Sequence, residues 1–155
     1  MVFMSTIVDA VSALRELPTQ AHQGLAFEKL MVNFIKADPI LSGEYDEVYR
    51  WQGWKYNGGK ADTGIDLVAR RREDGRWTAI QCKFYLPSTS LQKQHMDSFF
   101  EASGRSFITE EGSDSFANRL IISTTDKWSA NAEAMMDNQV IPTNRLDNRQ
   151  VVGEC

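Results

Sequence analysis

The chain has 155 residues and a formal net charge of −4 at pH 7, from 17 Lys and Arg against 21 Asp and Glu. This length suits one domain, and 42% hydrophobic with 25% charged residues is typical of a folded globular protein. No apolar run approaches the roughly 20 residues that cross a bilayer. Asp9, Arg15 and Glu16 interrupt the first segment, which excludes a signal peptide. We therefore expect a cytoplasmic protein.

The two cysteines, Cys82 and Cys155, cannot build a disulfide framework. Together with His22 and His95 they also lack the spacing of a Cys/His zinc site. The net negative charge argues against a protein that coats DNA through bulk charge. Basic residues nevertheless concentrate in the middle of the chain: positions 49–60 contain three basic residues and no acidic ones.

Apolar periodicity predicts two helices at the start of the chain. The first spans Ser5–Leu17, with Ser5 as a possible N-cap and Pro18 ending it. The second spans Gln20–Ala37 and ends at Asp38-Pro39, because the residue before a proline disfavours helical geometry.

A short strand is predicted at Glu47–Trp51 and a loop at Trp54–Gly64. Ile65–Arg72 and Arg76–Tyr85 are the clearest strands, because Asp74-Gly75 between them is a strong hairpin signal. The remaining chain predicts, in order, a helix at Leu91–Ser103, an acidic connection at Phe107–Phe116, a buried strand at Asn118–Ser123, a helix at Ser129–Asn138 and a short strand at Val140-Ile141. This order implies an α/β fold, with a mixed sheet and helices on both faces.

A turn centred on Asp74-Gly75 gives the hairpin a register in which Asp66 faces Lys83 and Val68 faces Gln81. The opposite face holds the expected core residues: Ile65, Leu67, Ala69, Ile80, Cys82 and Phe84. One interpretation is a cross-strand ion pair at a solvated strand end. The other is a metal-assisted hydrolytic site. There, Asp66 would hold a divalent cation through oxygen, Lys83 would steady the attacking water or the developing charge, and Gln81 would hold water or phosphate.

The residues Gly64–Ala69 (GIDLVA) and Ala79–Tyr85 (AIQCKFY) resemble the D…QxK variant of the PD-(D/E)XK nucleases, which is typical of the Mrr-like restriction endonuclease family. Gly24–Leu30 (GLAFEKL) resembles the family's opening helix, whose glutamate completes the metal site and here is Glu28. The resemblance implies a restriction-endonuclease-like mixed sheet flanked by helices on both faces.

Further segments, including Val48–Trp51 and Ile121–Thr125, resemble the N-terminal nuclease domain of single-chain type ISP restriction-modification enzymes. That resemblance implies a DNA-cleaving module, with double-stranded DNA as its partner and dimerisation as a possible step in cleavage. The chain contains no GxxxxGK[ST] phosphate loop. We therefore expect the helicase-like motor, methyltransferase and target-recognition domains in missing parts of the same chain. The expected organisation is an N-terminal helix at 1–18, the nuclease domain at 19–147 and a tail or linker at 148–155.

The resemblance implies a catalytic set of Glu28, Asp66, Gln81 and Lys83. It places Mg²⁺, with Mn²⁺ as a substitute, on Asp66, Glu28 and the backbone carbonyl of Cys82. In-line attack by water would leave a 5′-phosphate and a 3′-hydroxyl. Because Gln81 stands where many relatives have an acid, we expect modest metal affinity, with several waters kept on the ion.

Lys55 and Lys60 alternate with aromatic residues, a pattern that can hold phosphates and stack on bases. The aromatic Trp51 is more readily explained as a residue folded over the sheet. Thr124, Thr125 and Lys127 follow a buried strand and precede a helix, where a phosphate could bind. An equally good interpretation is that these residues cap the helix that follows.

Two other functions stay open from the sequence. One is a stand-alone Mrr-type or DNA-repair nuclease that acts without a motor. The other is a non-catalytic DNA-binding or docking module that keeps the nuclease fold.

Overall fold

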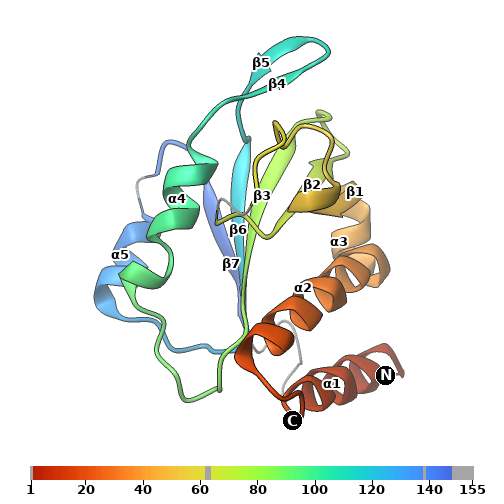
Figure 1. The fold of residues 1–155 in the computed structure, drawn as a ribbon, viewed down its shortest axis with the longest axis vertical. Helices are drawn as coiled ribbons and strands as arrows, with labels where there is room; N and C mark the ends of the chain where they lie inside the picture. Colours follow the sequence, from red (N-terminus) through yellow and green to blue (C-terminus); the bar gives the residue numbers. More distant parts are fainter. Residues whose placement is uncertain (1, 62–63, 138, 148–155) are drawn as a thin grey trace.

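A five-stranded mixed sheet lies between two helical layers in the computed structural model, which describes residues 2–61, 64–137 and 139–147 (Figure 1). Its strand order is β1-β2-β3-β6-β7, antiparallel from β1 to β3 and parallel from β3 to β7. The strands are β1 (Tyr45–Arg50), β2 (Leu67–Arg71), β3 (Trp77–Lys83), β6 (Asn118–Ser123) and β7 (Thr143–Leu146). The predicted mixed α/β architecture is confirmed.

The helices divide between the two faces of this sheet (Figure 1). They are α1 (Val2–Leu14), α2 (Gln20–Ala37), α3 (Pro39–Glu44), α4 (Asp97–Ser103) and α5 (Ala130–Met136), with short 3₁₀ turns η1 (Trp51–Gly53) and η2 (Lys93–His95). A separate two-stranded hairpin, β4 (Phe107–Thr109) and β5 (Gly112–Asp114), extends beyond the sheet. Within the described residues, no helix has both the length and the apolar character that a bilayer span requires.

Each face of the sheet has its own hydrophobic core. Under α2, Phe27 and Met31 pack with Leu67 and Ile80. Under the loop after β1, α4 and α5, a second cluster includes Trp54, Phe99, Val68, Ala79 and Ile121. The predicted core set is therefore wrong at two residues: Val68, placed on the opposite face, is fully buried, and Ile65 belongs to the second cluster. Helices on both faces bury both sets of alternating side chains.

The β2–β3 hairpin differs from the predicted register by two positions. Leu67 pairs with Ile80, and a four-residue loop replaces the two-residue turn, since the Arg71 N–H donates to the Arg76 carbonyl at 2.8 Å. Gly75 closes this loop at a φ of +69°, a conformation that favours glycine. A shift of two preserves which side chains share a face. Asp66 therefore lies opposite Gln81 rather than Lys83.

Several helices and strands also begin or end at residues other than the predicted ones. The first helix begins at Val2, so Ser5 lies inside it rather than at its N-cap. The helix predicted at 91–103 is split into η2 and α4. The final strand begins at Thr143, after Pro142, while Val140 is fully exposed. The acidic connection at 107–116 forms the β4–β5 hairpin.

One buried cation joins β6 to the helical layer. The guanidinium of Arg119 is buried, and it donates to the Ser103 hydroxyl at 2.6 Å and to the Phe100 carbonyl at 3.3 Å. It also lies over the Phe100 ring, 4.8 Å from the centroid. Burial lowers the pKa of Arg119 from its ordinary value, and the neutral oxygens compensate for part of the lost hydration.

Arg119→Ala should lower the free energy of unfolding by about 2–3 kcal/mol, because it leaves buried acceptors without donors. Urea unfolding followed by circular dichroism measures this. Arg105→Ala is the matched control, since Arg105 is exposed and pairs with the exposed Glu101 four residues earlier. The control should change stability by less than about 0.5 kcal/mol. Equal effects of the two substitutions would contradict the anchoring role of Arg119.

Candidate active site

Asp66 lies immediately before β2, and its carboxylate is held by the neighbouring strand. Its backbone N–H donates to the Ile80 carbonyl at 3.0 Å, continuing the ladder. Its Oδ2 accepts the Cys82 N–H at 2.8 Å and the Gln81 Nε2 at 3.2 Å. Two donors on one oxygen fix the direction of the carboxylate relative to β3.

Gln81 is almost completely buried, at 5% exposed. Its Nε2 donates to both the Gly64 carbonyl, at 3.0 Å, and the Asp66 carboxylate. Because both neighbours only accept hydrogen bonds, the orientation of the amide is determined. Its Oε1 is buried and finds no hydrogen-bond partner among the described residues. An acceptor left in this way is suited to a water molecule or to a ligand donor.

Gly64 precedes these residues at a φ of +91°. A Cβ atom at this position would lie 3.0 Å from the backbone carbonyl group of Ser98, which packs against it from α4. The carbonyl of Gly64 also orients Gln81. Glycine is therefore required both by its backbone conformation and by the close approach of α4.

The pKa of the partly buried Cys82 thiol reflects the charges around it. Burial, the largest cause, raises its pKa well above the ordinary value, and the negative charges of Asp66 and Glu28 raise it further. The positive charge of Lys83 acts in the opposite direction. These three charged side chains come from the segment before β2, from α2 and from β3. They therefore lie close enough to one thiol to influence its ionisation.

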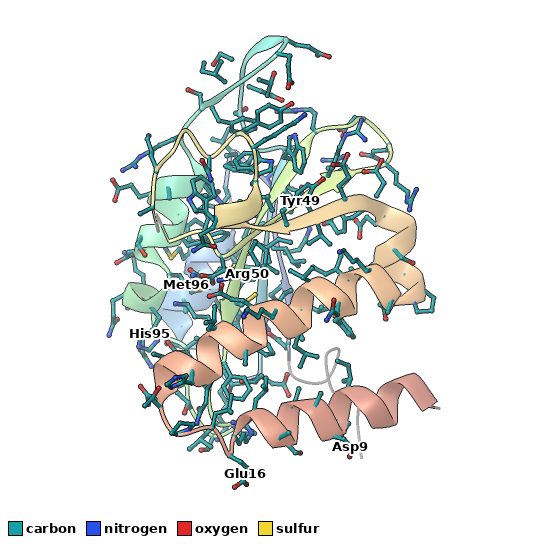
Figure 2. All side chains as sticks on the ribbon, turned by 45° about the vertical axis from the view of Figure 1, so that its right-hand side comes forward. Asp9, Glu16, Tyr49, Arg50, His95 and Met96 are labelled. Carbon is teal, nitrogen blue, oxygen red and sulfur yellow. The ribbon has the colours of Figure 1, made fainter. Side chains whose placement is uncertain are left out.

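Glu28 lies on α2 next to the buried Phe27, and its side chain is 21% exposed. The Nε of Arg50, at the end of β1, lies 3.6 Å from the Glu28 carboxylate. Figure 2 shows the Arg50 side chain beside α2. Arg50 was not predicted to take part in the site. Its place in a basic segment was the only signal, because pairing between β1 and α2 depends on the tertiary fold.

The donors present suit a hard divalent cation. Two carboxylates, Asp66 and Glu28, and the nearby Cys82 carbonyl are oxygen ligands of the kind that Mg²⁺ prefers. The unpartnered buried Gln81 Oε1 adds an acceptor for a cation-bound or free water. No cluster of three His, Cys, Asp or Glu side chains that could hold a metal occurs in the described part of the chain. With two carboxylates and a neutral glutamine, the set carries few negative charges.

The residues predicted to contact DNA separate into two groups. Lys55, Lys60 and Lys127 are exposed, with Lys55 3.3 Å from Glu110. Thr124 and Thr125 are fully buried, and their hydroxyls donate to carbonyls of the loop after β3, at Tyr85 and Thr89, at 2.6 Å each. The Thr125 hydroxyl also accepts the Lys127 N–H at 3.1 Å. The N-cap of α5 is Ser129, so the capping alternative is wrong for Thr124 and Thr125. Their hydroxyls hold the loop after β3, so their side chains are not retained as DNA contacts. Trp51 is buried over the sheet, as predicted.

A mixed sheet that brings an aspartate, a glutamine and a lysine from adjacent strands beside a helical glutamate defines a restriction-endonuclease-like nuclease domain. The restriction endonuclease family model Mrr_cat_2 matches residues 36–153, so the chain belongs to that family. Membership implies nuclease activity, and the family generally uses divalent metal ions. No curated protein sequence matches the chain significantly.

Two solved structures are similar. The chain matches the ATP-dependent Type ISP restriction-modification enzyme LlaBIII bound to DNA with a TM-score of 0.67 and 25% identity, over 89% of this chain and 8% of that one. The MspJI restriction endonuclease in complex with a 27-mer oligonucleotide matches with a TM-score of 0.42 and 13% identity, over 88% of this chain and 32% of that one. The chain thus spans a small fraction of the length of each.

Gly64→Ala should lower the free energy of unfolding by about 1–3 kcal/mol, because a side chain at positive φ is strained and meets the Ser98 backbone. Gly24→Ala is the control. Gly24 lies in α2 with open space around its Cβ direction, so alanine should stabilise the helix by about 0.5–1 kcal/mol. Urea unfolding checks both values, and stabilisation by Gly64→Ala would contradict the described backbone.

The pKa of the Cys82 thiol tests which charged side chains lie near it. In a Cys155→Ser background it is the only thiol, and its rate of alkylation by iodoacetamide as a function of pH gives its pKa. Glu28→Gln and Asp66→Asn should each lower that pKa, and Lys83→Met should raise it further. Glu16→Gln, at an exposed residue that is not among the charges acting on the Cys82 thiol, should leave it unchanged. An unchanged pKa in Glu28→Gln would remove Glu28 from the site.

Proposed function

We propose that this chain is a Mg²⁺-dependent DNA endonuclease domain and that it serves as the cleavage module of a larger, ATP-driven restriction-modification enzyme. The single observation that carries the proposal is the hydrogen-bonded contact of Asp66 with Gln81 and the Cys82 N–H, beside the charges of Glu28 and Lys83. This set of groups matches what phosphodiester hydrolysis requires: acids for a cation and a positively charged group for the phosphate.

Asp66, Glu28 and the Cys82 carbonyl would hold the cation. When bound, Mg²⁺ supplies Lewis-acid polarisation of the phosphate and compensates its negative charge. The other steps belong to this chain's residues. Gln81 Oε1 accepts a hydrogen bond from the attacking water and orients it, since this acceptor has no partner among the described residues. The Lys83 ammonium stabilises the charge that develops on the phosphate oxygens.

Arg50 would control the position of Glu28. Its Nε lies 3.6 Å from the Glu28 carboxylate, on the side of β1, so it holds the carboxylate next to the strands in the absence of a cation. A guanidinium also lowers the net negative charge of the site. Both effects fit the modest metal affinity expected for a site with two acids.

Two observations support the assignment to a larger enzyme: the small share of LlaBIII that this chain matches, and the net negative charge of this chain. The similar region of LlaBIII is 8% of a chain whose description includes ATP dependence, restriction-modification and bound DNA. A nuclease domain with a net charge of −4 gains little DNA affinity from bulk charge. Neighbouring domains of the same chain would supply the DNA affinity that this domain lacks.

Cleavage of supercoiled plasmid tests the function. With Mg²⁺ or Mn²⁺ the chain, or its longer parent with ATP, should nick or linearise the plasmid, and EDTA should abolish the reaction. Lys83→Ala and Asp66→Asn should each reduce the rate by roughly 100-fold or more, because each removes a group used in the transition state.

Lys36→Ala is the matched lysine control, since Lys36 is exposed near the end of α2 and is not part of the site. It should cleave at the wild-type rate. Unfolding curves for each variant separate loss of chemistry from loss of fold. Full activity in a folded Lys83→Ala variant, or undiminished cleavage in EDTA, would contradict the proposal.

A further inference from the structure

A cavity of about 260 Å³ lies outside the site described above, between the loop after β1 and the segment that joins α4 to β4. Figure 1 shows this loop (gold) below the β4–β5 hairpin. The cavity is smaller than the roughly 300–1,000 Å³ sites that enclose drug-sized ligands. Its volume therefore suits one planar ring system.

The floor of the cavity is aromatic and buried. Trp54 is 1% exposed, and its ring centroid lies 5.5 Å from that of Trp51, 5.0 Å from that of Phe107 and 5.6 Å from that of Phe116. These residues and the half-buried Tyr56 all line the cavity. Rings arranged in this way offer flat apolar surfaces to a planar guest.

The rim of the cavity is basic. Three of its lining residues, Lys55, Lys60 and Arg105, are cationic and exposed, and none of its lining residues is acidic. Lys55 and Arg105 have acidic partners, Glu110 and Glu101, but both acids are solvent-exposed and lie outside the lining. In a protein with an overall charge of −4, this rim favours an anionic guest.

One polar atom in the floor has no partner. The indole N–H of Trp54 is buried and makes no hydrogen bond within the described residues. The indole N–H of Trp51, by contrast, donates to the Lys60 carbonyl at 3.0 Å. An indole N–H buried without an acceptor is uncommon, because its desolvation is not compensated. A guest that carries a hydrogen-bond acceptor on a flat ring would satisfy it.

From these three features we propose that this cavity binds a single unstacked nucleobase of the DNA, with the flanking phosphates on Lys55, Lys60 and Arg105. The proposal rests on DNA being the substrate of this domain. Stacking on the aromatic floor and donation from the Trp54 indole recognise the base. The rim lysines and arginine pair with the backbone on either side of it.

The position of the cavity couples it to the candidate active site. The backbone N–H of Trp51 donates to the Asp66 carbonyl at 3.0 Å, so the loop that forms the cavity is attached to the strand segment that carries Asp66. A base held here would fix the strand next to the hydrolytic groups. The cavity is thus a positioning site and does not take part in the chemistry.

Binding of two fluorescent 12-mers in EDTA tests the proposal. One is oligothymidine, and the other has the same phosphates but abasic sugars throughout. Wild type should bind oligothymidine roughly tenfold more tightly, the value of about one stacked base. The ratio should not change with salt, since both strands carry equal charge.

Ser106→Trp is the decisive variant. Ser106 lines the cavity but is exposed, so a tryptophan there fills the cavity without removing any core ring. The tenfold preference should fall to about one, while Ser113→Trp, on exposed β5 outside the lining, should retain it. Trp54→Phe, which removes the N–H together with part of the ring, should reduce the preference in part.

Equal affinity of wild type for the two strands would overturn the proposal, as would an unchanged preference in Ser106→Trp. Either result would assign the cavity to another occupant, such as a protein side chain. These results are separable from the nuclease function, because plasmid cleavage by wild type is measured independently. A base preference without any cleavage would keep the cavity as a base site and contradict the nuclease.

Discussion

The carboxylate of Asp66 holds together the strands on which the candidate site is built. A single carboxylate oxygen accepts hydrogen bonds from the Cys82 N–H and the Gln81 side chain. Because Asp66 precedes β2, its side chain takes the place of a backbone acceptor beside β3. Gln81 is oriented in turn by the Gly64 carbonyl. A polar network of this kind is stable at low exposure only if each donor has an acceptor. Among the described residues, Gln81 Oε1 is buried without a hydrogen-bond partner, and a water molecule or the substrate would supply the missing donor.

The two-sided burial of the sheet explains why these groups gather at one place. Helices α2 on one face and α4 on the other cover the strands, so their central positions are apolar and fully buried. The charged groups of the site gather where β2 begins and β3 ends, at the edge of this cover, where desolvation of a charge costs less. Glu28 reaches this place from α2, and Arg50 holds it from β1. The same geometry leaves the loop after β1 free to fold back and form the aromatic cavity.

Local patterns predicted most of this architecture. The GIDLVA and AIQCKFY segments predicted the two strands and the groups they bring together, and the helix at Gln20–Ala37 has the predicted limits. The register of the hairpin was wrong by two because a four-residue loop and a two-residue turn share the same Asp-Gly signal. That error preserved the face of each side chain.

The features that escaped prediction depend on distant contacts. The burial of Val68 requires the aromatic loop to cover the second face, and the pairing of Arg50 with Glu28 requires α2 to cross β1. The threonines after β6 lie between a strand and a helix, where the sequence suggested that a phosphate could bind. In the fold, the carbonyls of residues 85–89 surround them. No local pattern contains this information.

The proposed mechanism requires that Asp66, just before β2, and Glu28, on α2, hold one divalent cation. Mn²⁺ binding followed by electron paramagnetic resonance of the free ion measures this directly. The account predicts one bound Mn²⁺ per chain, with affinity lost in both Asp66→Asn and Glu28→Gln and retained in Glu16→Gln. Wild-type binding by a folded Glu28→Gln variant would contradict it.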